Sequence, residues 1–128
     1  MNRIVTDSNS LAGEGHGPVV DLTERDFDKA LSENTVVFVD FWAPWCAPCR
    51  AFAPIYEGVA HKYPQVLFAK VNVDVELKLA ERYPIRSIPS LYIFVNRALI
   101  HTRAGALSGS ALEAVVGEVV SHRPSLNA

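Results

Sequence analysis

Cysteine is scarce in this sequence: only two of the 128 residues are cysteine, Cys46 and Cys49. Two cysteines are too few to hold together a small secreted protein, and a chain of this length can bury a sizeable core without cross-links. A disulfide between them would close a very small loop and remove little conformational entropy from the unfolded chain. The pair is therefore a poor structural cross-link, which leaves a metal site or a redox couple to consider.

Three further features are missing from the sequence. No apolar run approaches the ~20 residues that a membrane-spanning helix needs. Lys and Arg number 12 against 14 Asp and Glu, so there is no excess of positive charge to favour nucleic acid. Residues 1–17 contain no hydrophobic segment of the kind found in secretory signals. We therefore expect a cytoplasmic protein that binds neither nucleic acid nor membrane.

The composition predicts one domain with a short tail at each end. Apolar residues make up 49% of the chain and charged residues 20%, a balance typical of soluble globular proteins. Residues 1–17 are rich in Gly, Ser and Asn and have no periodicity, so we expect a flexible N-terminal tail. The patterned region, residues 18–122, is the predicted domain, and residues 123–128 are expected to form a C-terminal tail.

The apolar pattern predicts strands that alternate with helices. Residues 18–22 predict a short edge strand, and residues 23–32 a helix with Thr23 as its N-cap. Residues 35–43, TVVFVDFWA, form a nearly continuous apolar run rich in β-branched and aromatic residues. Such a run is typical of a strand that is buried on both faces in the middle of an α/β sheet.

The remaining segments continue this alternation. They predict a helix at 49–63 that Pro54 should kink, a strand at 65–75, a helix at 75–83, strands at 90–96 and 98–105, and a helix at 108–122. A tight turn at Asn96 and Arg97 is expected to join the last two strands. The order predicts an α/β protein with a parallel sheet, helices on both faces, and antiparallel strands added by the hairpin.

The two cysteines are placed where a thiolate is favoured. They directly follow the predicted buried strand and open a helix, so Cys46 is expected at the helix N-terminus. Free backbone N–H groups and the helix dipole favour an anion there, which should lower the pKa of Cys46. Cys49 lies one turn further on and should be more buried. This asymmetry suits a nucleophile, Cys46, and a second thiol that resolves the mixed disulfide. Pro48 fits the first turn of a helix.

A metal site is the alternative use of the pair. A closed site needs about four ligands. The chain has four histidines, but none has ligand spacing to the cysteines or to another histidine: His16, His61, His101 and His122. A C-x-x-C pair within an α/β pattern favours redox chemistry, so we predict no metal.

Several motifs in this chain together resemble the thioredoxin family. They are VDFWA, WCAPC, AP in the next helix, KVNVD, IRSIPS and AGALS. The resemblance extends from about residue 19 to residue 120, and the set is far more specific than any one motif. It implies the thioredoxin fold, a central five-stranded mixed β-sheet flanked by four α-helices. It also implies that Cys46 is the exposed nucleophile and Cys49 the resolving thiol.

Two charged residues gain a predicted role from the resemblance. Asp40 lies in an otherwise apolar strand, where burial should raise its pKa and make it a candidate proton acceptor near neutral pH. A structural acid is the alternative. In the family this position lies behind the second cysteine and helps to deprotonate it. Lys70 matches the lysine that lies beside that aspartate. Without the resemblance, Lys70 would be interpreted as a charged residue at the edge of a strand.

The resemblance also implies a surface for client proteins. It implies that Ile88–Pro89 is a cis peptide bond packed against the disulfide, exposing backbone groups that can pair with an extended client segment. Trp45 should support an apolar client surface. Gly105 and Ala106 match a loop beside the cysteines where small side chains let a client backbone approach. Without the resemblance, Pro89 would be interpreted as a proline at the start of a strand, and Gly105 as part of a turn that leads into a helix.

Four features depart from the family pattern. Ala47 replaces the usual glycine before Pro48, so these two residues are expected to tune the redox potential. Arg97 replaces a hairpin glycine, at a cost of roughly 1 kcal/mol if its φ is positive. Ser87 replaces a glycine near Pro89, where it would narrow the client groove. The N-terminal tail is longer than in the short family form and contains no cysteine, so no zinc-binding segment is expected.

The sequence therefore predicts a general protein disulfide reductase. The resemblance implies that a flavin- and NADPH-dependent thioredoxin reductase recycles it, that it binds no cofactor, and that disulfide-containing proteins are its clients. A monomer is expected. One alternative is an exported disulfide oxidant or isomerase, against which Ile88 argues, because such proteins more often have Thr or Val there. The other is a non-catalytic thioredoxin-fold binding module, against which the intact WCAPC motif argues.

Overall fold

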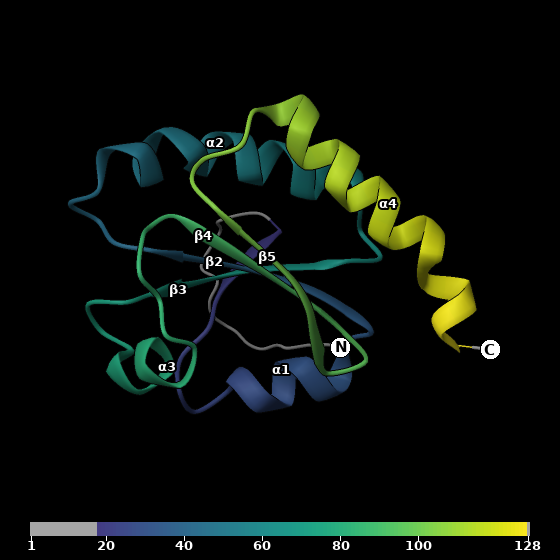
Figure 1. Cartoon of the computed structure of the whole chain (residues 1–128), viewed down its shortest axis with the longest axis horizontal. Coiled ribbons are helices and arrows are strands. Elements are labelled where there is room, and N and C mark those ends of the chain that lie inside the picture. The colour runs from purple at the N-terminus through teal and green to yellow at the C-terminus, as the bar shows by residue number, and fades with distance from the viewer. Residues whose placement is uncertain (1–17, 128) are drawn as a thin grey trace.

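The computed structural model describes residues 18–127, with side chains through Ser121 (Figure 1). The predicted N-terminal tail, residues 1–17, and the side chains of His16 and His122 lie outside the described residues. Among the helices of residues 18–127, none combines the length and the apolar character needed to cross a membrane.

Five strands form one mixed sheet, as predicted. In spatial order they are β1 (Val19–Asp21), β3 (Leu67–Asn72), β2 (Val36–Trp42), β4 (Ser90–Val95) and β5 (Ala98–Ala104). The first three are parallel, whereas β4 and β5 run antiparallel to their neighbours. The central strand β2 therefore has a hydrogen-bonded partner on each side.

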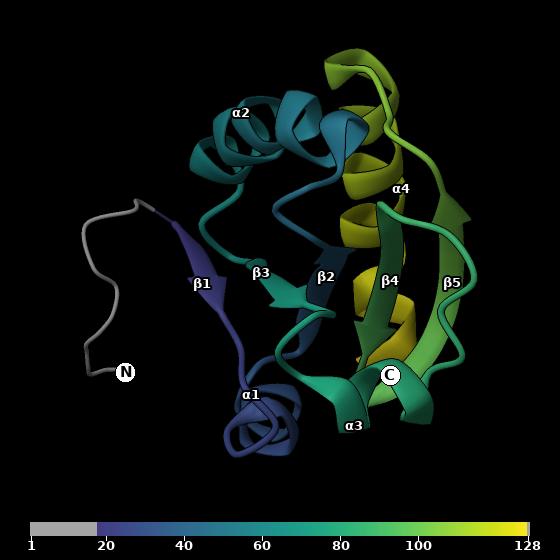
Figure 2. The same ribbon diagram turned by 90° about the vertical axis from the view of Figure 1, so that its left-hand side faces the viewer.

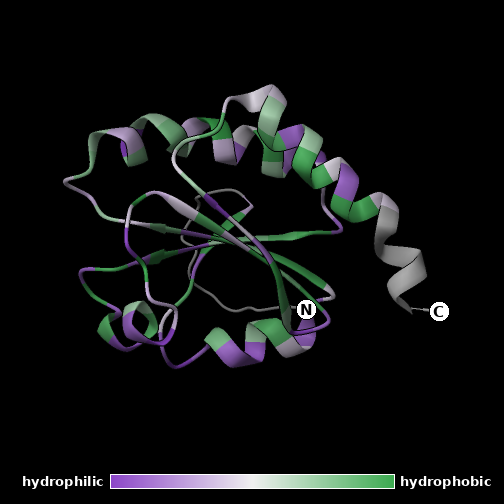
Figure 3. Ribbon diagram, viewed as in Figure 1, coloured by the Kyte–Doolittle hydropathy of each residue, from purple (hydrophilic) through white to green (hydrophobic). Residues whose placement is uncertain are grey.

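Two layers of helices cover the sheet. One face carries α2 (Ala47–Lys62) and α4 (Gly109–Asn127), and the other carries α1 (Phe27–Glu33) and α3 (Leu77–Arg82) (Figures 1 and 2). The apolar strands run between these layers (Figure 3). This is the predicted thioredoxin fold: a five-stranded mixed sheet flanked by four helices.

The burial of β2 follows from its place between the two helical layers. Phe38 packs into the core cluster under α2 and α4, and its neighbours Val37 and Val39 pack into the cluster under α1 and α3. Successive side chains of a strand point to opposite faces, so a strand covered on both sides must be apolar at every position. The one ionisable residue in β2 is Asp40, and the strand continues after it to Trp42 before the chain reaches the cysteines.

Two helix boundaries were predicted wrongly. The first helix begins at Phe27 rather than Thr23, because the backbone N–H and the hydroxyl of Thr23 both donate to Asp26 Oδ1, at 2.7 and 3.0 Å, and hold residues 23–26 in a turn. The last helix continues past His122 to Asn127, through the segment predicted as a C-terminal tail. The added segment of the last helix contains a proline. A proline removes one helical hydrogen bond, but the bonds on either side of it can still form.

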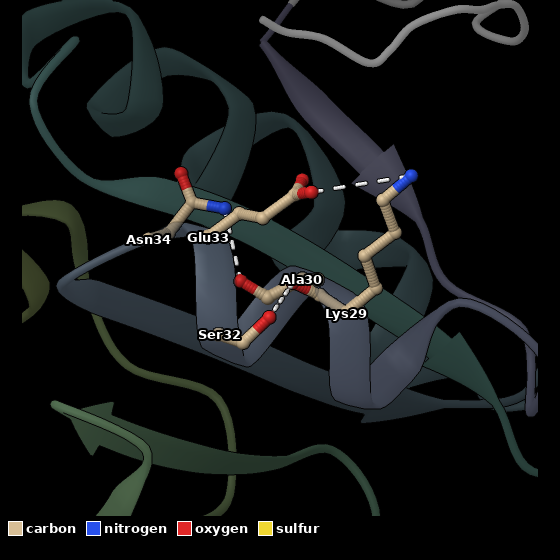
Figure 4. Close-up of polar contacts among 5 residues, drawn as sticks. All are labelled: Lys29, Ala30, Ser32, Glu33 and Asn34. Carbon is tan, nitrogen blue, oxygen red and sulfur yellow. Dashed lines mark hydrogen bonds and ion pairs between the residues drawn. The ribbon is translucent and has the colours of Figure 1, made fainter.

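Two side chains donate hydrogen bonds to carbonyl groups near the C-terminus of α1 (Figure 4). Asn34 Nδ2 donates to the Ala30 carbonyl at 2.9 Å, and Ser32 Oγ donates to the Lys29 carbonyl at 2.9 Å. The last carbonyls of a helix have no partner within the helix, so such side-chain donors stabilise its end. The helix ends there, and the chain enters β2 in an extended conformation.

The turn between β4 and β5 lies at the predicted position, and one of its residues has an unfavourable backbone conformation. Asn96 and Arg97 both have positive φ, 51° and 72°. Asn tolerates this region of backbone space, whereas Arg does so only at a cost, because its Cβ approaches a carbonyl oxygen.

We expect Arg97→Gly to raise the free energy of unfolding by about 1 kcal/mol, because glycine adopts positive φ without that steric cost. Urea denaturation of the oxidised protein measures the change. Arg97→Ala is the matched control, since it removes the long side chain but keeps the Cβ. An equal gain in both variants would trace the effect to the arginine side chain and not to the backbone.

Candidate active site

The two cysteines lie where β2 ends and α2 begins, and they are joined as a disulfide. Cys46 is the N-cap residue of α2, and its Sγ accepts the backbone N–H of Cys49 at 3.2 Å. Pro48 lies in the first turn, where its missing N–H would have had no helical partner. The predicted position of Cys46 at a helix N-terminus is confirmed.

This position favours negative charge on the Cys46 sulfur. The first N–H groups of α2 point out of the helix, and the helix dipole places partial positive charge at the same end. One of these N–H groups already donates to the sulfur in the disulfide form. The same contact would stabilise a thiolate at Cys46 after reduction.

Both sulfur-bearing residues are nearly covered by protein. Cys46 is 5% exposed and Cys49 2% exposed. They pack with Ala43 and against partly buried Trp42 and Ile88. The exposed nucleophile implied by the family resemblance therefore presents only a small surface, and the two cysteines differ more in their helix position than in their exposure.

The segment before β4 lies against the disulfide. The Ile88–Pro89 peptide bond is cis, as the resemblance implied, and the Ile88 carbonyl oxygen lies 3.8 Å from Cys46 Sγ. The backbone N–H of Gly105 donates to the Pro89 carbonyl at 2.8 Å. Gly105 has a φ of 90°, which a residue with a side chain rarely adopts. The structure thus brings Ile88, Pro89 and Gly105 to one side of Cys46, and Ala106 follows as an exposed residue.

Asp40 is a buried acid with a strongly shifted pKa. It is only 4% exposed, and burial raises its pKa from 3.8 to about 7, although the positive charge of Lys70 acts in the opposite direction. Its Oδ1 accepts no hydrogen bond from residues 18–127. The expected effect of burial on this carboxyl group is confirmed, and the group is poised to exchange a proton near neutral pH.

Strand register places Lys70 beside Asp40. The two residues are directly paired in the parallel ladder between β2 and β3. Lys70 Nζ lies 4.0 Å from the carboxylate of Asp21 and 4.9 Å from the centre of the Trp42 ring. The ammonium group is therefore held between an acid and an aromatic face at the edge of the site.

A cleft of about 200 Å³ connects the second cysteine with these charges. Cys49, Asp40 and Lys70 all line it, and Tyr56 and Glu57 of α2 line it as well. A cleft of this size and polarity can hold water molecules. It offers a route for a proton between the Cys49 sulfur, the Asp40 carboxyl group and the solvent.

Sequence reasoning missed the part played by Tyr56. Its side chain is completely buried, and its hydroxyl lies 3.0 Å from the Phe38 carbonyl and 2.9 Å from the Ala69 carbonyl. The phenol thus joins the cysteine-bearing helix to the strands that carry Asp40 and Lys70. Burial raises its pKa well above the ordinary value, so it stays a neutral donor. The available signal was a tyrosine on the buried face of a helix, because such a hydroxyl needs a partner.

The two tryptophans have different surroundings. Trp45 is 66% exposed, and its Nε1 donates to Asp74 Oδ2 at 2.8 Å. Trp42 is half-buried beneath Lys70, and its Nε1 has no hydrogen-bond partner among residues 18–127. Asp74 was not predicted to belong to the site, although it ends the quoted KVNVD motif.

Within the described residues, no group of three or more His, Cys, Asp or Glu side chains could hold a metal ion. His61 lies on α2 and His101 on β5, and both are exposed. The redox group of this site is the Cys46–Cys49 disulfide itself.

Comparisons with known proteins agree with this site. A family model described as thioredoxin matches residues 18–118. A putative thioredoxin 2 of Streptomyces coelicolor is 39% identical over 99 residues, which cover 77% of this chain and 74% of that protein. A thioredoxin of Buchnera aphidicola is 42% identical over 92 residues, covering 70% of this chain and 84% of that protein.

Solved structures give the same result. The structure of Plasmodium falciparum thioredoxin superimposes with a TM-score of 0.73 at 35% identity, covering 77% of this chain and 97% of that one. A mutant thioredoxin of Halobacterium salinarum superimposes with a TM-score of 0.74 at 28% identity, covering 80% and 92%. Sequence, fold and the disulfide at the start of α2 therefore agree that this chain belongs to the thioredoxin family and is a thiol–disulfide oxidoreductase.

Proposed function

We propose that this protein is a general protein disulfide reductase in which Cys46 is the nucleophile and Cys49 the resolving thiol. The observation that carries the assignment is the N–H of Cys49 directed at the Cys46 sulfur from the first turn of α2. Only Cys46 occupies the N-cap position, so only its thiolate gains fully from the helix terminus.

The reaction transfers two electrons in two exchange steps. The Cys46 thiolate attacks one sulfur of a client disulfide, a Cys46–client disulfide forms, and the other client sulfur leaves as a thiolate. The Cys49 thiolate then attacks Cys46 Sγ, which releases the second client thiolate and leaves the Cys46–Cys49 disulfide. The client disulfide is reduced to two thiols, and the dithiol of this protein is oxidised.

We propose that Asp40 accepts the proton of Cys49 through water in the cleft. A carboxyl group with a pKa of about 7 can accept and return a proton near neutral pH. Lys70 supports the charged form of Asp40 by its proximity in the ladder. Asp40 and Lys70 thus control the second exchange step in this proposal, whereas the first depends on Cys46.

The proposed client surface surrounds the Cys46 sulfur. Trp45 offers an exposed aromatic face next to it, and the cis Ile88–Pro89 segment presents the backbone groups of Ile88 to an extended client segment. Gly105 and Ala106 leave room for the client backbone on the adjoining loop. Within the disulfide loop, Ala47 and Pro48 set the stiffness of the first helical turn and are proposed to tune the redox potential.

The proposal includes a reductase that restores the dithiol. Reduction by a flavin-dependent thioredoxin reductase, with electrons from NADPH, is typical of the family, and a cycle driven by NADPH operates in a reducing compartment such as the cytoplasm. We propose that the protein acts as a monomer.

Reduction of insulin by dithiothreitol tests the proposed function. The wild type should accelerate reduction, Cys49→Ser should not, and titration in redox buffers should give the wild-type pair a strongly negative potential. Poor reduction together with a much less negative potential would instead favour a disulfide oxidant or isomerase. Absence of any reducible pair would favour a binding module.

A further inference from the structure

Apolar side chains gather at one end of the molecule, beside the disulfide. Among residues 18–121, the three most exposed large apolar side chains are Trp45 at 66%, Val75 at 63% and Leu77 at 62%. The other large apolar side chains with substantial exposure are only 41–47% exposed, and they lie on β1 and β5. We call Trp45, Val75 and Leu77 the apolar patch.

A hydrogen bond joins the two segments that form the patch. The Trp45 indole donates to Asp74, which directly precedes Val75, although the bonded residues are 29 positions apart in the sequence. Figures 1 and 2 show the loop before α2 and the turn between β3 and α3 at the same end of the molecule. Trp45 is also the immediate neighbour of Cys46, so the patch extends from the disulfide to the start of α3.

The turn that presents Val75 is well ordered by hydrogen bonds. The Asn72 carbonyl accepts the N–H groups of Val75 and Glu76 at 3.1 and 2.9 Å, and Asn72 Oδ1 accepts the N–H of Asp74 at 2.9 Å. The backbone N–H groups of residues 74–76 are therefore satisfied within the turn, and its exposed side chains are Val75 and Asp74, which holds the Trp45 indole.

Glu76, which lies between Val75 and Leu77 in the sequence, is hydrogen-bonded to the segment before α1. Glu76 Oε1 accepts the backbone N–H of Glu24 at 2.9 Å, and Glu24 Oε2 accepts the N–H of Lys78 at 2.9 Å. This reciprocal pair of contacts fixes the start of α3 against the segment before α1. The Glu76 carboxylate is thus directed at the backbone of the segment before α1.

We propose that Val75 and Leu77 extend the client surface beyond Trp45 and make this protein prefer client segments with apolar side chains beside the reacting disulfide. The inference rests on the proposed function. Exposed apolar side chains that gather in one place, rather than being scattered singly over the surface, mark an interaction site. The patch is continuous with the disulfide through Trp45, and a permanent partner there would obstruct access to Cys46. The occupant must therefore be transient, as a client is.

Two synthetic peptides test the preference. They share one cystine loop, but apolar residues flank it in the first and Ser and Gln flank it in the second. In reduction driven by dithiothreitol, we expect the double variant Val75→Ser/Leu77→Gln to raise KM for the apolar peptide roughly fivefold, with kcat unchanged. The KM for the polar peptide should stay the same.

The control is the double variant Leu99→Gln/Ile100→Ser, which makes a comparable change on β5, where these side chains are 43% and 47% exposed. It should leave KM for both peptides unchanged. If the wild type reduces both peptides with equal KM, or if the patch variant alters neither KM, the proposed preference is wrong while the reductase function stands. If the wild type reduces neither peptide nor insulin, the function itself fails. A wild type that dimerises and a patch variant that does not would make a second copy of the chain the occupant.

Discussion

Replacing Cys49 with serine is expected to stop the reaction after its first step and leave the protein covalently bound to its client. Cys46 would still attack the client disulfide, because the N-cap position of its sulfur does not depend on the Cys49 thiol. The mixed disulfide would then persist, since the thiol that resolves it is missing. Turnover should fall by roughly 10³-fold or more. Non-reducing electrophoresis and mass spectrometry of the trapped complex measure the outcome.

The companion variant Cys46→Ser distinguishes the roles of the two cysteines. It should give neither turnover nor a trapped complex, because Cys49 lies inside the first turn of α2 and lacks the N-cap position that favours a thiolate at Cys46. Ala47→Gly serves as a positive control, since it changes the same loop but keeps both thiols and should retain turnover. Efficient trapping by Cys46→Ser and none by Cys49→Ser would reverse the assignment.

The elements of the fold could be predicted because each has its own local pattern. β2 is apolar at almost every position because both of its faces are covered, and that pattern is visible in the sequence. The turn at Asn96 and Arg97 separates two apolar runs. The start of α1 was predicted wrongly at Thr23 because the side chain of Asp26 closes a turn there, and an acid three residues after a threonine fits either a turn or a helical cap.

The site could be predicted only in part, because much of it depends on contacts between distant segments. The spacing and position of Cys46 and Cys49 were sufficient to predict redox chemistry. Lys70 required the family resemblance, because its place beside Asp40 is a matter of strand register. The links made by Tyr56, and by Trp45 with Asp74, join segments 13 to 29 residues apart, and no local pattern specifies them.

Asp40→Asn is expected to stabilise the oxidised protein strongly at alkaline pH and hardly at all at acidic pH. Between pH 3.8 and about 7 the folded protein keeps a proton on Asp40 that the unfolded chain has released. Raising the pH through this range therefore favours the unfolded chain, by about 1.4 kcal/mol per pH unit. The wild type should lose up to about 4 kcal/mol by pH 8 through this group, whereas asparagine never ionises and avoids the loss.

Urea denaturation at pH 4 and pH 8 separates this effect from a general change in packing. The two proteins should differ little at pH 4, where Asp40 is neutral in the folded state, and the variant should be the more stable one at pH 8. Asp21→Asn is the matched control, because Asp21 also lies near Lys70 but its side chain is 66% exposed, so we expect a change below about 0.5 kcal/mol at either pH. Equal stability of Asp40→Asn and the wild type at pH 8 would contradict a raised pKa.

The same variant should release clients from the mixed disulfide more slowly, because asparagine cannot accept the proton of Cys49. The raised pKa of Asp40 would then have two effects: it lowers the stability of the fold and speeds up the attack of Cys49 on the mixed disulfide. An unchanged rate of client release would limit Asp40 to its effect on stability.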